Sequence, residues 1–292
     1  MTEKADPTFA AIPADRADHA TARIAVLPVP YDGTVTWHRG AARGPEAIIE
    51  ASQHMELFDE ALRVTPAALG IATEPPVDVT GEPKDVLERV ESRVTDILAR
   101  GAFPVLLGGE HSVTVGAVHA CVRERSEISV LVLDAHADLR NEYEWEPLSH
   151  ACTVARIREA VSSTVQVGVR SMSSPEAERI RDEGIQVVMA PEARGMRDWD
   201  DVLMHLKANV YVSVDVDVFD PSVVPHTGTP EPGGLDWYDV VSLLEAVFGS
   251  RNVVGCDVVE LSPADGGHAS DFTCARLAYR MMGLRFRDEL RT

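Results

Sequence analysis

Two kinds of hydrophobic pattern alternate along the chain. Short segments that are apolar at almost every position predict strands buried on both faces of a sheet. Strands predicted in this way span residues 22–31, 102–109, 128–138, 164–170, 185–190, 209–221 and 252–261. Longer segments whose apolar residues recur every three or four positions predict helices. These helices span residues 44–58, 85–100, 112–125, 150–160, 174–184, 199–207, 236–249 and 269–286.

The regular succession of strands and helices predicts an α/β fold with a parallel sheet covered by helices on both faces. No linker interrupts the succession, so we expect one domain over residues 22–292. Residues 1–21 are rich in Ala, Asp and Pro and are expected to form an irregular N-terminal arm. In sheets of this kind, ligands bind beyond the carboxyl ends of the strands.

The amino-acid composition limits the classes of molecule that the protein is expected to bind. The net charge is −20, and such a surface repels nucleic acid and anionic membranes while it suits cationic ligands. Lysine is confined to Lys4, Lys84 and Lys207, which fits either a GC-rich genome or adaptation to high salt. We find no apolar segment of signal-peptide or membrane-spanning length and no paired cysteine motif. We therefore expect a cytoplasmic protein.

Side chains of the kind that bind metals follow one of the predicted strands. Asp134, His136 and Asp138 stand at alternate positions after the apolar run 129–133. If the backbone stays extended, alternate residues share one face, and all three point into one crevice at the edge of the sheet. Three other strand-end segments carry similar groups. They supply Glu110 and His111, then Asp215, Asp217 and Asp220, and finally Asp257 and Glu260.

A divalent metal is the simplest reason to gather so many carboxylates, because buried carboxylates are costly unless a cation neutralises them. Two histidines among four aspartates favour a first-row metal such as Mn²⁺ over Ca²⁺ or Mg²⁺. Six ligands, two of them able to bridge, suit a pair of ions that activates a shared water. Each motif alone is weak evidence, but their joint occurrence at strand ends predicts a metal site.

Several segments of the chain resemble a known family when they are taken together. GGEHS, DAHADLR, SVDVDVFDP and DVVELSP, with SHACTVARI and SDFTCARLAYRMM, look like the recurring blocks of the arginase/agmatinase family, the ureohydrolases. The last two look most like its agmatinase-type branch. The resemblance implies a three-layer α/β/α arginase-like fold with a central, mostly parallel eight-stranded sheet. It also implies two Mn²⁺ ions per subunit, with Ni²⁺ or Co²⁺ as alternatives, and a trimer or hexamer.

The resemblance also implies a role for each matching residue. One metal ion would be held by His111, Asp134, Asp138 and Asp215. The other would be held by Asp134, His136, Asp215 and Asp217. Asp134 and Asp215 would then bridge the two ions. Asp138 would orient the attacking water, Glu260 would pair with the guanidinium, and His150 would carry a proton to the leaving amine.

The loop LRNEYEWEPLSHA, residues 139–151, bears on the choice of substrate. Arginases carry an Asn- and Ser-containing loop at this point, and here it is acidic. Glu142 and Glu144 would disfavour a substrate with a carboxylate and favour one with a second amine. We therefore expect hydrolysis of agmatine to putrescine and urea. Arg140 and Arg39 would reverse this argument if they faced the cavity.

Several alternatives remain open at this point. N1-aminopropylagmatine suits an acidic loop equally well, and guanidine, guanidinobutyrate and arginine are further substrates within the family. A single-zinc deacetylase shares a related fold, and an inactive metal-binding assembly partner is the non-enzyme alternative. Two departures from the family pattern, Trp37–Gly40 and His226, bear on specificity if they face the cavity.

Overall fold

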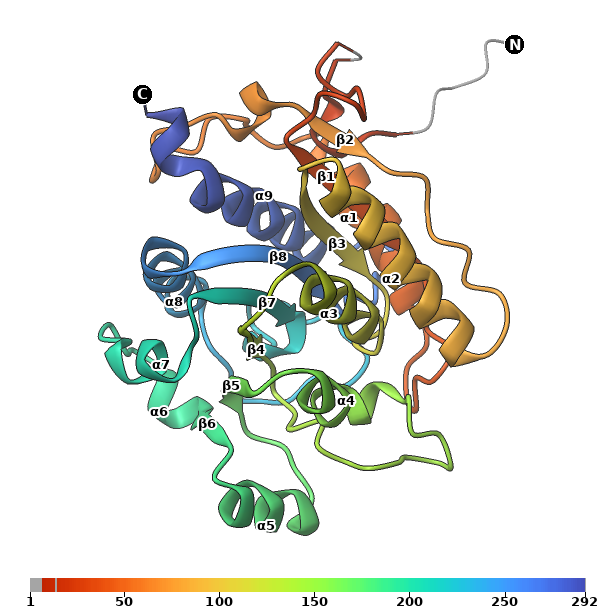
Figure 1. Cartoon of the computed structure of the whole chain (residues 1–292), viewed down its shortest axis with the longest axis vertical. Coiled ribbons are helices and arrows are strands. Elements are labelled where there is room, and N and C mark those ends of the chain that lie inside the picture. Colours follow the sequence, from red (N-terminus) through yellow and green to blue (C-terminus); the bar gives the residue numbers. More distant parts are fainter. Residues whose placement is uncertain (1–6, 14, 292) are drawn as a thin grey trace.

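Eight parallel strands form one sheet at the centre of the molecule (Figure 1). The computed structural model describes residues 7–13 and 15–291. The strands are β1 (Ile24–Val29), β2 (Ile71–Thr73), β3 (Phe103–Gly108), β4 (Ile128–Leu133), β5 (Ser163–Val169), β6 (Gln186–Met189), β7 (Asn209–Asp215) and β8 (Asn252–Val259). Their order is β2-β1-β3-β8-β7-β4-β5-β6, and each neighbouring pair is parallel. The predicted α/β fold with an eight-stranded sheet is confirmed.

Helices cover both faces of the sheet. They are α1 (Gly44–Ser52), α2 (Pro83–Ala99), α3 (Val113–Glu124), α4 (Thr153–Ala160), α5 (Ser174–Glu183), α6 (Ala190–Ala193), α7 (Asp200–His205), α8 (Trp237–Ser250) and α9 (His268–Leu290). Short 3₁₀ turns are η1 (Phe9–Ala11), η2 (Ala41–Arg43), η3 (Pro66–Leu69), η4 (His150–Cys152) and η5 (Val216–Val218). Apolar residues of α1, α8 and α9 form one core layer with the sheet. Those of α2, α3 and α4 form the second (Figure 1).

Local signals explain where the helices begin and end. Helix α8 begins after Asp236, whose side chain accepts a hydrogen bond from the Asp239 amide (2.9 Å). In return, the Asp239 carboxylate accepts a hydrogen bond from the Asp236 amide (3.2 Å). Both amides, which have no carbonyl partner within the helix, are thereby hydrogen-bonded. Helix α5 ends at Glu183 and is followed by Gly184, whose φ of 62° is the left-handed conformation that stops helices. Among the described residues, no helix is long and apolar enough to cross a bilayer.

The hydrophobic pattern missed one strand of the sheet. Strand β2 has three residues and pairs with β1 from Ile24 opposite Ile71. A strand this short at the edge of a sheet carries too few apolar positions to stand out from a loop. The described part of the N-terminal arm packs beside this edge, with Phe9 fully buried and its amide donating to Thr73 Oγ1 (2.9 Å).

Strand order explains why the chemical motifs meet. Strands β3, β8, β7 and β4 are consecutive in the sheet. These are the strands that precede His111, Glu260, Asp217 and Asp134. Because all four strands are parallel, their carboxyl ends open at one edge, where ligands bind in open α/β sheets.

Candidate metal centre and the cavity above it

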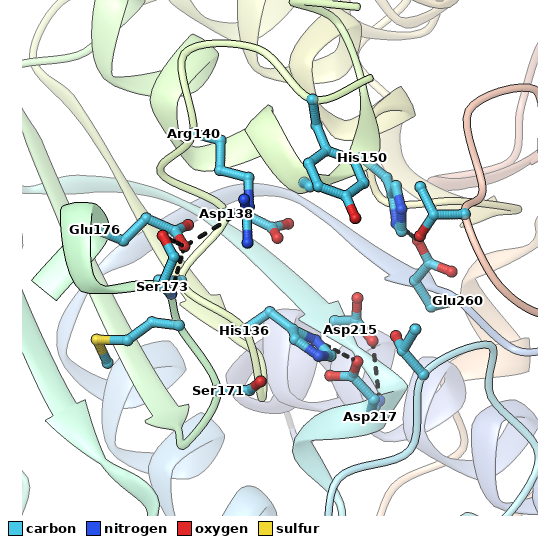
Figure 2. Close-up of a pocket in the computed structure, with 16 residues that line it drawn as sticks. His136, Asp138, Arg140, His150, Ser171, Ser173, Glu176, Asp215, Asp217 and Glu260 are labelled. Carbon is cyan, nitrogen blue, oxygen red and sulfur yellow. Dashed lines mark hydrogen bonds and ion pairs between the residues drawn. The ribbon is translucent and has the colours of Figure 1, made fainter. Parts of the chain in front are cut away.

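A cavity of about 240 Å³ opens at this edge of the sheet (Figure 2). Acidic side chains dominate its charged lining. Five lining residues are carboxylates, two are histidines and one is an arginine, namely Asp138, Glu176, Asp215, Asp217, Glu260, His136, His150 and Arg140. The excess of carboxylates makes the cavity a site for cations.

Turns, rather than extended strands, bring the ligands together. Strand β4 ends before Asp134, the Asp134 carboxylate accepts a hydrogen bond from the His136 amide (2.6 Å), and Asp138 has a φ of 49°. Strand β7 ends at Asp215, whose carboxylate accepts from the Asp217 amide (2.9 Å) within η5. The expectation that alternate residues share the face of an extended strand is therefore wrong. The aspartates themselves bend the backbone, as short acidic side chains do in turns.

A close approach of two backbones places His111. The amide of Glu110 donates to the carbonyl of Tyr31 (2.7 Å), so the segment after β3 lies directly on the segment after β1. A Cβ on Gly109 would collide with that same carbonyl. A larger residue would therefore not fit at the second glycine of the GGEHS motif, and the close approach fixes the segment that carries His111.

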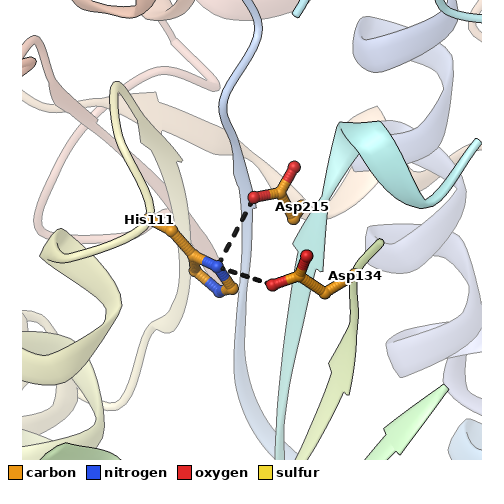
Figure 3. A group of neighbouring side chains, drawn as sticks. All are labelled: His111, Asp134 and Asp215. Carbon is orange, nitrogen blue, oxygen red and sulfur yellow. Dashed lines mark ion pairs between the residues drawn. The ribbon is translucent and has the colours of Figure 1, made fainter. Parts of the chain in front are cut away.

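The residues that the structure describes contain two groups of side-chain atoms that could bind a metal ion, here called metal-type clusters. The first is centred on the His111 imidazole (Figure 3). Its Nδ1 lies 3.1 Å from Asp134 Oδ2, 3.2 Å from Asp138 Oδ2 and 3.4 Å from Asp215 Oδ2. All four residues are buried. Within the described chain, His111 Nδ1 and Asp134 Oδ2 have no hydrogen-bond partner. Buried polar atoms are rarely left unpaired, so these atoms fit a bound cation.

The second group shares Asp134 with the first. His136 Nδ1 lies 2.9 Å from Asp217 Oδ2 and 3.6 Å from Asp134 Oδ1. Asp134 therefore offers one carboxylate oxygen to each group, which is the arrangement a bridging ligand needs. The structure thus brings the six predicted ligands into two adjoining clusters. Asp215 belongs to the first cluster only.

The electrostatics of the two clusters favour a bound cation. Burial, followed by the charges of Asp217 and Asp134, raises the pKa of Asp215 well above its ordinary value. Burial and the charge of Asp134 likewise raise the pKa of Asp138 to about 6. Asp215 and Asp138 therefore resist ionising beside Asp134 when nothing else is bound. Burial would raise the pKa of Asp134 too, but its contacts with His111 and His136 outweigh that effect and lower it. Divalent ions would relieve this repulsion, and mixed imidazole and carboxylate donors suit first-row metals.

A histidine–carboxylate pair forms one wall of the cavity. His150 Nδ1 lies 3.3 Å from Glu260 Oε1, and Glu260 also accepts a hydrogen bond from the His111 amide (2.8 Å). Burial lowers the pKa of His150, but its contact with Glu260 outweighs that effect and raises the pKa to about 9. His150 Nε2 is buried without a partner in the described part of the chain. The imidazole thus carries a proton near neutral pH beside the cavity.

Comparison with known proteins places these motifs in one family. A model of the arginase family matches residues 22–283. The chain belongs to the arginase family. The relationship that the sequence motifs suggested is thereby confirmed, and the strand-end motifs that form the two clusters all lie inside the matched region.

Individual members of the arginase family cover almost the whole chain. The N(1)-aminopropylagmatine ureohydrolase of Thermus thermophilus is 41% identical over 273 residues, covering 92% of each chain. The agmatinase of Pyrococcus horikoshii is 34% identical over 269 residues, covering 90% of this chain and 92% of its own. The crystal structure of the agmatine ureohydrolase of Thermoplasma volcanium matches with a TM-score of 0.89 at 28% identity, covering 99% and 97% of the two chains.

The charged residues at the mouth of the cavity differ from those predicted from the sequence. Glu142 and Glu144 are exposed and do not line the cavity. Arg140 does line it, but its Nε lies 3.8 Å from Glu176 Oε2 and its guanidinium stacks on the Tyr143 ring at 4.7 Å. The nearby Glu176 offsets part of this charge, and five lining carboxylates outweigh one arginine, so Arg140 does not turn the cavity into an anion site.

The two departures from the family pattern also fall outside the cavity lining. Trp37 is 73% exposed, and neither Trp37 nor His226 is among the lining residues. The His226 ring packs against Gly267, where a Cβ would collide with it. Neither residue therefore forms part of the cavity wall.

Sequence reasoning missed two polar residues that support the site. Thr34 accepts a hydrogen bond from the His150 amide (2.9 Å) and donates to Glu110 Oε1 (2.6 Å). Ser213 lies 3.0 Å from His111 Nε2. Ser213 carried a usable signal, because it is a lone polar residue inside an apolar strand, two positions before Asp215. Thr34 sits in a loop with no periodic pattern, so nothing in the sequence marked it.

Proposed function

We propose that this protein is a metal-dependent ureohydrolase that removes urea from the guanidino group of a polyamine, with N1-aminopropylagmatine as its substrate. The observation that carries the proposal is a carboxylate-rich cavity directly above two metal-type clusters, with the His150–Glu260 pair on its wall. The Thermus relative, at 41% identity, supports this choice of substrate through the activity in its name. Agmatine is the second candidate, favoured by the Thermoplasma structure.

Two Mn²⁺ ions fit the donor atoms. His111, Asp134, Asp138 and Asp215 would hold one ion, and His136, Asp217 and Asp134 would hold the other. Ni²⁺ and Co²⁺ accept the same ligands and are the alternatives. When bound, the ions would neutralise the carboxylates and supply a water that is activated near neutral pH.

The remaining residues would bind the substrate and move its protons. Glu260 would receive the guanidinium, whose planar fork matches a carboxylate. Asp138 would orient the attacking water. As the water oxygen bonds to the guanidinium carbon, the bond from that carbon to the alkyl-bearing nitrogen breaks. His150 would give its proton to this nitrogen. Of the two protons of the attacking water, one would pass by way of Asp138 to the leaving nitrogen and the other would restore His150, so that the products are an alkylammonium ion and urea.

Charge at the mouth supports a substrate with a cationic tail. Glu231 Oε1 lies 4.0 Å from His136 Nε2, and its side chain is 35% exposed. Glu142 and Glu144 lie farther out on the loop that carries Tyr143 to the cavity. Together with the five carboxylates of the cavity lining, these side chains make the surroundings of the site an acidic rim. An ammonium tail is attracted there, whereas a carboxylate tail is repelled.

A substrate panel tests this proposal. With Mn²⁺ supplied, we expect the highest kcat/KM for N1-aminopropylagmatine, followed by agmatine. Arginine and guanidinobutyrate should fall at least about 100-fold lower, because a like charge at an acidic site costs several kcal/mol. The measurement is urea release from each compound, with guanidine included as the tail-free reference. Efficient turnover of guanidinobutyrate would contradict the acidic-rim argument, and intact substrates throughout would contradict the proposed activity.

We further propose the setting in which the enzyme works. Residues 22–292 form its catalytic domain and residues 1–21 its N-terminal arm. The family resemblance supports a homo-oligomer, a trimer or hexamer, and the charge of −20 supports small cationic ligands rather than nucleic acid or membranes as partners. The composition supports a cytoplasmic location.

A further inference from the structure

We propose that Asp257 and Ser213 are positioning residues that fix the tautomer of His111, so that Nδ1 presents a lone pair to the metal centre. This inference rests on the proposed metal-dependent function. Asp257 lies in β8 beneath the cavity and is fully buried. Three hydroxyl groups surround its carboxylate. They belong to Ser213 (2.6 Å to Oδ1), Thr114 (2.9 Å to Oδ2) and Tyr211 (2.9 Å to Oδ2).

Counting protons determines the direction of each hydrogen bond. An ionised carboxylate only accepts hydrogen bonds, and a serine hydroxyl has one proton to donate. At 2.6 Å from Asp257 Oδ1, Ser213 directs that proton to the carboxylate. Ser213 Oγ also lies 3.0 Å from His111 Nε2. With its proton committed, Ser213 must accept here, so the Nε2 of His111 carries the hydrogen.

The other face of the imidazole shows why this arrangement matters. His111 Nδ1 lies within 3.4 Å of three carboxylates, from Asp134, Asp138 and Asp215. Those carboxylates attract a proton to Nδ1, which would occupy the lone pair that a metal ion needs. A neutral imidazole has only one proton. By holding it on Nε2, the Asp257–Ser213 pair keeps Nδ1 free, as outer partners of metal-binding histidines commonly do.

Asp257→Asn tests the proton count. The asparagine amide can donate to Ser213, which then turns its own proton toward His111 Nε2 and leaves Nδ1 protonated. We expect the Kd for Mn²⁺, measured by calorimetry on metal-free protein, to rise about 10- to 100-fold. Ser213→Ala removes one oxygen and should raise the Kd about 10-fold. In both variants, added Mn²⁺ should restore kcat while the substrate KM stays unchanged.

Tyr211→Phe is the matched control, because it removes a hydroxyl from the same carboxylate but leaves the Ser213 route intact. It should keep the wild-type Mn²⁺ affinity, and Ser213→Thr should rescue most of the affinity that Ser213→Ala loses. Wild-type affinity in both Asp257→Asn and Ser213→Ala would overturn the inference. An equal loss in Tyr211→Phe would also overturn it by indicating a general packing effect. If the wild-type protein itself binds no Mn²⁺, the proposed function fails as well.

Discussion

Asp134→Ala is expected to abolish metal binding and urea release together. Asp134 contributes one oxygen to the His111 cluster and the other to the His136 cluster, so its removal deprives both ions of a ligand. Loss of an activated water nucleophile removes several kcal/mol of catalysis. We therefore expect kcat to fall about 10³-fold or more, accompanied by loss of bound Mn²⁺ in elemental analysis.

Asp201→Ala is the control for this prediction. Asp201 is exposed in the first turn of α7 and lies outside the cavity lining. This variant should keep both its metal and its activity. Circular dichroism should show that the Asp134 variant remains folded, because the hydrophobic core on both faces of the sheet is untouched. An Asp134→Ala protein that retains two equivalents of Mn²⁺ would show that the ligand set is wrong.

His150→Ala is expected to separate catalysis from metal binding. His150 pairs with Glu260 and belongs to neither metal-type cluster. Its partnerless Nε2 is the atom placed to give a proton to the leaving nitrogen. Loss of a positioned general acid lowers kcat about 10²- to 10⁴-fold. The Kd for Mn²⁺, measured by calorimetry, should stay at the wild-type value.

His119→Ala serves as the control for the second prediction. His119 lies on α3 with a side chain 40% exposed, and its only ion-pair contact in the described chain is Glu91 at 3.9 Å. The control should match the wild-type enzyme in kcat and in metal affinity. A His150→Ala enzyme with wild-type kcat would refute the role of His150 as proton donor, and one without metal would place His150 among the ligands.

The sequence predicted most of the architecture because buried parallel strands leave a strong signal. The segments that became β1, β3 and β4 are apolar at almost every position, and strand–helix alternation then fixes a parallel sheet. Strand β2 was missed because three edge residues carry little pattern. The helix predicted at 44–58 ends at Ser52, since the later apolar residues, such as Met55 and Leu57, pack on the core from a turn and loop.

The candidate metal ligands could be identified from the sequence, but the backbone conformation that brings them together could not. Alternate spacing drew attention to Asp134, His136 and Asp138, whereas the structure brings them together through turns closed by side-chain hydrogen bonds. Side-chain direction after a strand depends on such local bonds, which spacing cannot report. Ser213 and Thr34 were missed for a related reason, since supporting residues are recognised by what they contact.

Substrate specificity was the least predictable part. The acidic loop suggested that Glu142 and Glu144 approach the substrate, yet both are exposed beyond the cavity lining. Arg140 does reach the cavity, and Glu176, which lies 36 positions farther along the chain, offsets part of its charge. Contacts between such distant residues come from the fold. The electrostatic effect of a charged residue on the cavity therefore cannot be predicted from the sequence alone.

The most direct test of this account is to count and locate the metal ions in crystals of the wild-type protein grown with Mn²⁺, using anomalous scattering. The account predicts two ions per chain at the edge of the sheet. One should lie against His111 and Asp215, the other against His136 and Asp217, with Asp134 touching both. A single ion, or ions bound away from these residues, would contradict the central claim that the clustered carboxylates exist to hold a metal pair.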